Sequence, residues 1–207
     1  MNNYADAPDQ LLQQHGKSFY WAGLFLTREQ LIAAKKLYAF CRYIDDVVDE
    51  SDDAKQAKET ILAIQQDIKT DTESKHIIVR QMQILACDYG IPKAIILDLI
   101  DGVSWDLEHA TIHTEAELFR YSYGVASTVG LIMCYILGVT DKKAHRFAID
   151  LGIAMQLTNI ARDVVEDAEK GRIYLPLVWL PDGITPASIA DPSHHNDVFQ
   201  VIQTLLK

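Results

Sequence analysis

The sequence predicts an all-α fold, and three observations support this prediction. Apolar residues recur at helical spacing along most of the chain, and no run alternates with the period of two that is typical of a strand. Capping residues, glycines and prolines stand where these periodic segments meet. The longest uncharged run, residues 121–140, contains several glycine, serine and threonine residues. We therefore expect a helix buried within a helical domain rather than a membrane span.

Length and composition narrow the class of protein further. The 207 residues suffice for one domain with a substantial core, so we expect residues 1–207 to form a single domain. A net charge of −10 argues against nucleic acid as a partner. The odd number of cysteines argues against a disulfide framework, and the amino terminus has neither the basic start nor the apolar run of a signal peptide. The expected location is cytoplasmic, with peripheral membrane contact left open by the uncharged run.

Local signals set the expected helix boundaries. Thr27 followed by Gln30 forms a capping box, and Pro92 suits the first turn of a helix. Gly90, Gly138 and Gly171 follow the ends of periodic segments. The expected helices span residues 11–26, 27–51, 60–69, 76–89, 92–110, 115–137, 141–169 and 198–206, with a loop over residues 177–197.

A polar stripe runs along the helix expected over residues 141–169. Gln156, Asn159, Asp163 and Asp167 are spaced three, four and four. They therefore fall within an arc of about 80° on an otherwise apolar helix. A buried carboxylate pair is costly unless positive charge lies against it, so this helix needs a positive partner.

A second stripe lies far upstream, in the helix expected over residues 27–51. Its members are Tyr38, Arg42, Asp45 and Asp49. Each of the two helices thus presents an Asp-x-x-x-Asp pair from one face, and carboxylates one turn apart suit Mg²⁺, which often bridges to a phosphate. Either pair alone could be a solvated acidic helix face. The two together, with Arg42 and Arg162 adjacent, favour a site for Mg²⁺ and a diphosphate.

Two other patterns are less informative. His109 and His113 are one turn apart beside Asp106, which would suit a transition metal, but an exposed helix end explains them more simply. Gly124, Ser127 and Gly130 recur every three residues, so one face of the helix is small. That face could accommodate a neighbouring helix or a lipid tail.

The chain resembles the squalene/phytoene synthase family of head-to-head prenyl transferases, and is most like its bacterial phytoene synthases. The resemblance covers residues 15–176 and is carried by HGKSF, YAFCRYIDDVVDE, ELFRYSYGVASTVG and AMQLTNIARDVVEDAEKGRIYLP. It implies a single-domain isoprenoid-synthase-type helical bundle around a central cavity. Relatives continue with further helices, so we expect a bundle that lacks the last of them.

The resemblance also implies a function. It predicts an Mg²⁺-dependent enzyme, with Mn²⁺ as a substitute and no NAD(P)H, that condenses two geranylgeranyl diphosphates to phytoene through cyclopropyl prephytoene diphosphate. One alternative is a C30 enzyme that acts on farnesyl diphosphate and gives squalene, dehydrosqualene or presqualene-type products. Another is a non-catalytic member that serves as a binding or assembly factor. The expected partners are prenyl diphosphates, and a homo-oligomer is left open.

Residue roles follow from the same resemblance. Asp45 and Asp49 would hold Mg²⁺ on one diphosphate, and Asp163 and Asp167, with Asn159, would hold a second set. The residues expected to bind substrate are His15, Ser18, Phe19, Tyr38, Arg42, Val125, Val129, Gln156, Asn159, Arg162 and Arg172. Among these, the arginines would contact diphosphate oxygens and the valines the isoprenoid tail. The catalytic set comprises the four aspartates, Arg42 and Tyr121.

Overall fold

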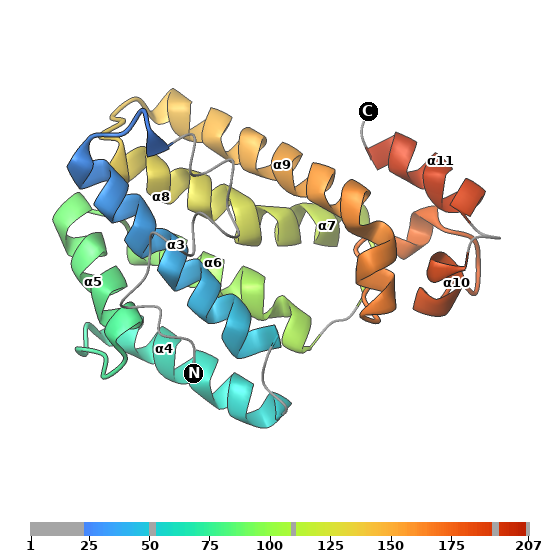
Figure 1. Ribbon diagram of the computed structural model, residues 1–207, viewed down its shortest axis with the longest axis horizontal. Coiled ribbons are helices and arrows are strands. Elements are labelled where there is room, and N and C mark those ends of the chain that lie inside the picture. The colour runs from blue at the N-terminus through green and yellow to red at the C-terminus, as the bar shows by residue number, and fades with distance from the viewer. Residues whose placement is uncertain (1–22, 50–52, 109–110, 192–194, 206–207) are drawn as a thin grey trace.

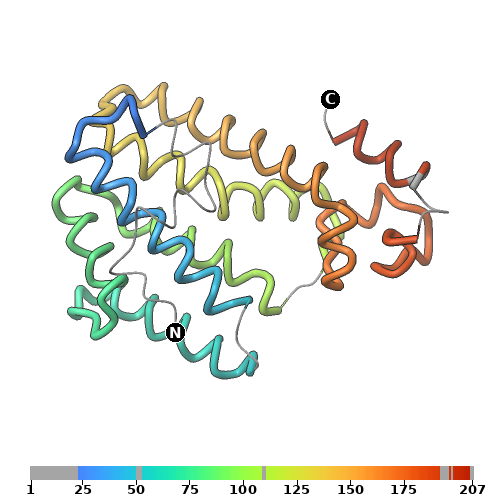
Figure 2. Tube along the Cα trace, in the orientation of Figure 1, coloured from blue at the N-terminus to red at the C-terminus, as the bar shows by residue number. Residues whose placement is uncertain are grey.

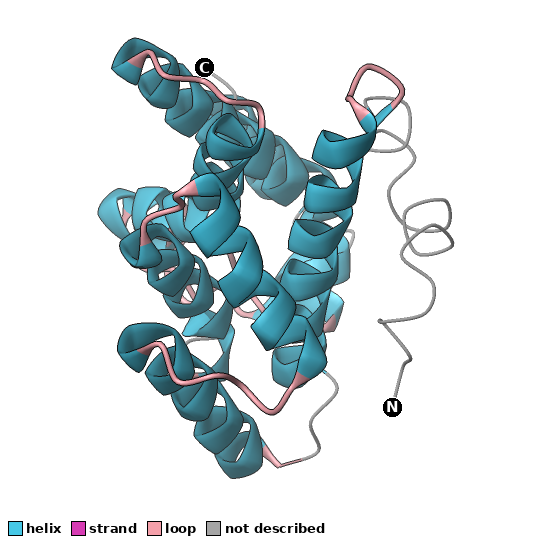
Figure 3. Cartoon of the chain, turned by 90° about the vertical axis from the view of Figure 1, so that its left-hand side faces the viewer, coloured by secondary structure: helices cyan, strands magenta, loops and turns pink. Residues whose placement is uncertain are grey.

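The protein is a helical bundle, as the sequence predicts. The computed structural model describes residues 23–49, 53–108, 111–191 and 195–205, and every regular element in these ranges is a helix (Figure 3). The predicted helix over residues 11–26 falls mostly outside them, and so do His15, Ser18 and Phe19. The elements are α3 (Arg28–Asp49), α4 (Ala54–Thr70), α5 (Ile77–Tyr89), α6 (Lys93–Ser104), η1 (Trp105–Leu107), α7 (Glu115–Ser122), η2 (Tyr123–Ser127), α8 (Thr128–Ile136), α9 (Lys142–Glu169), η3 (Leu177–Trp179), α10 (Pro186–Ala190) and α11 (His195–Leu205).

Capping residues explain where the helices begin. The capping box before α3 is confirmed, since the Thr27 and Gln30 side chains each accept a hydrogen bond from the other's backbone N–H, at 3.2 and 3.0 Å. Helix α4 begins earlier than predicted because the Asp53 carboxylate accepts from the N–H of Lys55 at 2.9 Å. Helix α6 ends earlier than predicted, at Ser104, and continues into the tight turn η1. The region expected to be a loop contains η3 and α10, and α11 begins at its end.

α7, η2 and α8 follow one another without a break and form one long helix, called the central helix below. Its small residues serve helix packing. A Cβ atom on Gly124 would come within 2.7 Å of Gly102 in α6, and one on Gly152 in α9 would come within 2.5 Å of the Ser127 backbone. This helix is interrupted by the π-helical turn η2, which joins α7 to α8. The face that was open to either a helix or a lipid tail is therefore filled by α6 and α9.

The buried side chains form two apolar clusters with a cavity at their junction. The first cluster is built mainly by α3 to α6 and α8, and the second by α7, the carboxyl-terminal part of α9 and described residues between 173 and 205. Figures 1 and 2 show α9 running along the bundle from the end of α8 to α10 and α11. Val125, in η2, packs against both clusters. The two polar stripes thus lie on helices of different clusters, α3 in the first and α9 in the second.

Helix α9 is covered on one side only in the described part of the chain. Phe147, Leu151 and Met155 are spaced four residues apart and are 72%, 62% and 50% exposed. The uncharged run behaves as predicted, since Leu131 and Ile132 in α8 are buried. Within the described ranges, no helix combines the length and apolar character needed to cross a membrane.

Candidate active site

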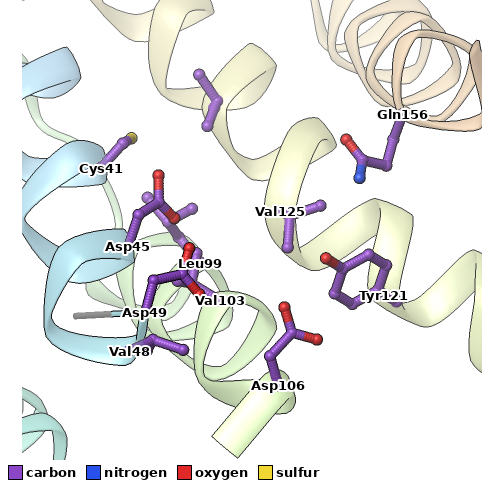
Figure 4. Close-up of a pocket in the computed structure, with 11 residues that line it drawn as sticks. Cys41, Asp45, Val48, Asp49, Leu99, Val103, Asp106, Tyr121, Val125 and Gln156 are labelled. Atoms are coloured by element: carbon purple, nitrogen blue, oxygen red, sulfur yellow. The ribbon is translucent and has the colours of Figure 1, made fainter. Parts of the chain in front are cut away.

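A cavity of about 250 Å³ lies between α3, α6, the central helix and α9. Its lining residues are Cys41, Asp45, Val48, Asp49, Leu99, Val103, Asp106, Tyr121, Val125, Val129 and Gln156 (Figure 4). Six predicted site residues therefore meet here, namely Asp45, Asp49, Tyr121, Val125, Val129 and Gln156. One cavity brings carboxylates from one polar stripe together with an amide from the other and with apolar side chains.

The α3 aspartates differ from each other in their surroundings. Burial, and after it the neighbouring Asp49 carboxylate, raises the pKa of Asp45 to about 6. Asp49 is 52% exposed and accepts a hydrogen bond from the Arg172 guanidinium at 2.6 Å. The Asp49 charge disfavours ionisation of Asp45, and a bound cation would remove this repulsion.

The α9 aspartates lie one turn apart on the same helix as Gln156. The Arg162 guanidinium donates to both oxygens of Asp163, at 2.7 and 2.6 Å, and lowers the pKa of that carboxyl. Burial, followed by the Asp163 charge, raises the pKa of Asp167 to about 6. Asn159 donates to the Gln156 side chain at 3.5 Å. The predicted stripe is thus half-buried rather than fully buried, and Gln156 is its member at the cavity wall.

The segment after α9 connects the two stripes. Gly171 takes a left-handed conformation, with φ of 80°, and the N–H of Arg172 caps the helix by donating to the Asp167 carbonyl at 2.9 Å. The next residue, Ile173, is fixed by a backbone hydrogen bond from Ile112 at 2.9 Å. Arg172 therefore leaves a firmly anchored backbone and reaches Asp49, 123 residues away in the sequence.

Asp106 is a site residue that the sequence reasoning missed. Its side chain is 10% exposed, its Oδ2 atom accepts from the Tyr174 hydroxyl at 2.6 Å, and burial is the main cause of its raised pKa. The Tyr174 ring stacks on Tyr121 with centroids 4.9 Å apart. A signal was present, because Leu99, Val103 and Asp106 are spaced four and three and share one helical face. Of the two histidines near Asp106 in the sequence, His113 is exposed and His109 lies outside the described residues.

Other predicted residues lie near the cavity without lining it. Arg42 pairs with the buried Asp46 at 2.8 Å, and Tyr38 is half-buried, with a pKa raised mainly by burial. In the described part of the chain, no group of three or more His, Cys, Asp or Glu side chains is arranged to hold a metal ion. The carboxylate pairs nevertheless fit Mg²⁺, which uses one or two protein carboxylates and completes its shell with water and phosphate.

Comparison with known proteins identifies the family. The squalene/phytoene synthase family model matches residues 12–207. The chain is 37% identical to a 15-cis-phytoene synthase of Enterobacter agglomerans, over 92% of this chain and 68% of that protein. It is 35% identical to a phytoene synthase of Rhodobacter capsulatus, over 95% of this chain and 60% of that protein. It therefore spans about two thirds of the length of these relatives.

A solved structure agrees with this assignment. The squalene synthase HpnC of Alicyclobacillus acidocaldarius superposes with a TM-score of 0.76 at 25% identity, covering 96% of this chain and 78% of that one. Family members are prenyltransferase-type enzymes that act on prenyl diphosphates. The predicted fold and the predicted resemblance are both confirmed. The chain belongs to the squalene/phytoene synthase family.

Proposed function

We propose that this protein is a prenyl transferase that joins two prenyl diphosphates head to head. One observation carries the proposal. The aspartate pair of α3 lines a cavity that also has apolar side chains in its walls, and Arg172 connects this pair to the end of α9, where the second pair lies. Two aspartate pairs near one cavity that also has apolar walls suit a substrate with a diphosphate head and a hydrocarbon tail.

The reaction needs Mg²⁺, and the paired carboxylates are its candidate ligands. Asp45 and Asp49 would hold the metal at one diphosphate, while Asp163, Asp167 and the Asn159 amide oxygen would hold it at the other. A divalent cation here would reverse the negative potential of the site and stabilise the departing diphosphate.

The remaining residues would divide between the leaving group and the carbocation. Arg42, Arg162 and Arg172 would supply permanently charged donors to diphosphate oxygens. At the other end of the cavity, Tyr121, Val125 and Val129 would keep water from the allylic cation. Figure 4 shows Asp45 and Asp49 on one side of the cavity and Tyr121, Val125 and Gln156 on the other.

Geranylgeranyl diphosphate is the proposed substrate, and phytoene the proposed product. The two curated relatives described above support this choice, since both are phytoene synthases. Farnesyl diphosphate is the second candidate, because HpnC, which shares the fold at 25% identity, is a squalene synthase. The depth of the cavity, rather than the aspartates, would discriminate between two tails that differ by one isoprene unit.

The test is an assay of the full chain with each diphosphate and Mg²⁺, which measures released diphosphate and extracted hydrocarbon. We expect both signals with geranylgeranyl diphosphate and a weaker or absent signal with farnesyl diphosphate. The reverse preference would favour the C30 reaction. Diphosphate release from neither substrate would reject the prenyl transferase proposal and favour a binding or assembly factor.

A further inference from the structure

Arg172 lies between two carboxylates that come from different elements. Its Nη2 atom is 2.6 Å from Oδ1 of Asp49 on α3, and its Nη1 atom is 3.8 Å from Oδ2 of Asp106 in η1. The first distance is a short charge-assisted hydrogen bond, whereas the second is an ion pair without one. The guanidinium is thus hydrogen-bonded to Asp49 and only loosely paired with Asp106.

Asp106 has unused capacity to accept a hydrogen bond. Its Oδ2 atom accepts from the Tyr174 hydroxyl, but its Oδ1 atom is buried and has no hydrogen-bond partner. An unsatisfied buried carboxylate oxygen is costly, and a charged donor nearby would remove that cost. Because Arg172 is already the neighbouring cation, a small movement of its side chain would complete a closer pair with Asp106.

A metal ion that binds Asp49 would have to compete with Arg172 for this carboxylate. In the proposed function Asp49 is a metal ligand, and here it forms a hydrogen-bonded ion pair with Arg172. A guanidinium and a divalent cation on the same carboxylate repel each other, so binding of one disfavours the other. The backbone on either side of Arg172 is held by hydrogen bonds, so the exchange requires movement of the side chain alone.

We propose that Asp106 is a positioning residue that receives Arg172 when a divalent cation binds Asp49. This inference rests on the proposed metal role of Asp49. Arg172 then acts as the internal counterion of Asp49, and Asp106 provides its second position. The exchange couples binding of the cation to binding of the diphosphate. A cation that reaches Asp49 also releases Arg172 from it, beside the place where the diphosphate would bind.

Binding of Mn²⁺ alone tests the exchange without turnover. We expect Arg172→Gln to bind Mn²⁺ about threefold to tenfold more tightly than the wild type, because the competing cation is gone. We expect Asp106→Asn to bind it about threefold more weakly, because Arg172 then has no second partner. In the double variant, Asp106→Asn should change the affinity by less than about twofold. Electron paramagnetic resonance of free Mn²⁺, with calorimetry as a check, gives these constants.

The controls separate this exchange from changes in net charge or in folding. Arg146→Gln removes an exposed arginine from α9 and should leave the Mn²⁺ affinity unchanged. Arg172→Lys keeps the charge and should stay close to the wild type. In the Asp49→Asn background the effect of Arg172→Gln should disappear, and thermal unfolding verifies that every variant is folded.

The outcomes distinguish the inference from the proposed function. Tighter Mn²⁺ binding by Arg172→Gln is informative, since a misfolded site would not gain affinity. An unchanged or weaker affinity in that variant would overturn the inference and leave the metal role of Asp49 standing. An equal loss from Asp106→Asn with and without Arg172 would show that Asp106 does not act through the arginine. Absence of Mn²⁺ binding to the wild type would overturn both.

Discussion

The aspartate pairs of α3 and α9 have the same spacing and unequal electrostatic surroundings. In each pair one carboxylate is neutralised by an arginine, while burial raises the pKa of the other to about 6. The arginine of the α9 pair is the adjacent residue, Arg162, whereas the arginine of the α3 pair is Arg172, which is 123 residues away from Asp49. The α9 pair is therefore neutralised locally, and the α3 pair only when the chain is folded.

Because of this difference, movement of the segment after α9 affects the α3 pair and the α9 pair unequally. Any movement of residues 171–176 relative to α3 changes the charge seen by Asp49, because Arg172 belongs to that segment. Asp163 keeps its partner whatever that segment does, since both residues lie on α9. The two pairs share a proposed role with a metal, and they differ in how their charge is neutralised.

The largest expected effect concerns what the pairs share. Asp49→Asn and Asp163→Asn should each lower the rate of diphosphate release at least about 100-fold, since each removes a charged ligand from a site that depends on electrostatic stabilisation. Asp150→Asn is the matched control, an exposed aspartate on α9 that lies away from the stripe. A near-normal rate for either site variant, measured with Mg²⁺ and the preferred diphosphate, would remove that pair from the proposed clamp.

The next effect concerns the carboxylates with raised pKa values. A raised pKa in the folded state means that folding favours the protonated form, so the stabilisation is complete below about pH 4 and is lost as pH rises through about 6. Unfolding free energy measured with chelator should therefore fall over this window. Asp45→Asn should raise stability at pH 7 by about 1 kcal/mol and flatten the profile. Asp167→Asn should raise the stability at pH 7 by a smaller amount.

Asp163 should behave in the opposite way. Its pKa is lowered by the hydrogen bonds from Arg162, so its contribution to stability is present near neutral pH and is lost as pH falls through the lowered pKa. Asp163→Asn should therefore give no gain at pH 7, in contrast to Asp45→Asn. Parallel urea unfolding of the two variants at pH 5 and pH 7 makes the comparison. Equal gains would mean that the unequal neutralisation has no energetic consequence.

The sequence was informative where local spacing determines the structure. The capping box at Thr27, the end of α5 at Gly90 and the two Asp-x-x-x-Asp faces depend on neighbours within one or two turns. The spacing of Asp106 from Leu99 and Val103 places it on their helical face, but its partners, Tyr174 and Arg172, lie more than 60 residues away, and no spacing rule joins it to them. The turn η2 was missed for a similar reason, since it depends on how the central helix packs against α6 and α9.

The structure gives the ion-pair partners of the arginines, whereas their contacts with a diphosphate are predictions. Arg42 pairs with Asp46, and Arg162 pairs with its neighbour Asp163, so each already has an acidic partner on its own helix. Contact with a diphosphate stays a prediction for both. Arg172 differs because its two partners lie on other elements, which makes it the arginine whose removal changes the relation between elements rather than the charge of one helix.

The smallest expected effect compares these local and distant ion pairs directly. Arg172→Gln should lower the thermal midpoint by about 2–4 °C, because it removes a contact between the segment after α9, α3 and η1. Arg162→Gln should lower the midpoint by less, because its partner is the adjacent residue and the side chain is exposed. It should also raise the pKa of Asp163, which carboxyl-carbon NMR would detect. A similar loss in both variants would mean that the two arginines serve their pairs in the same way.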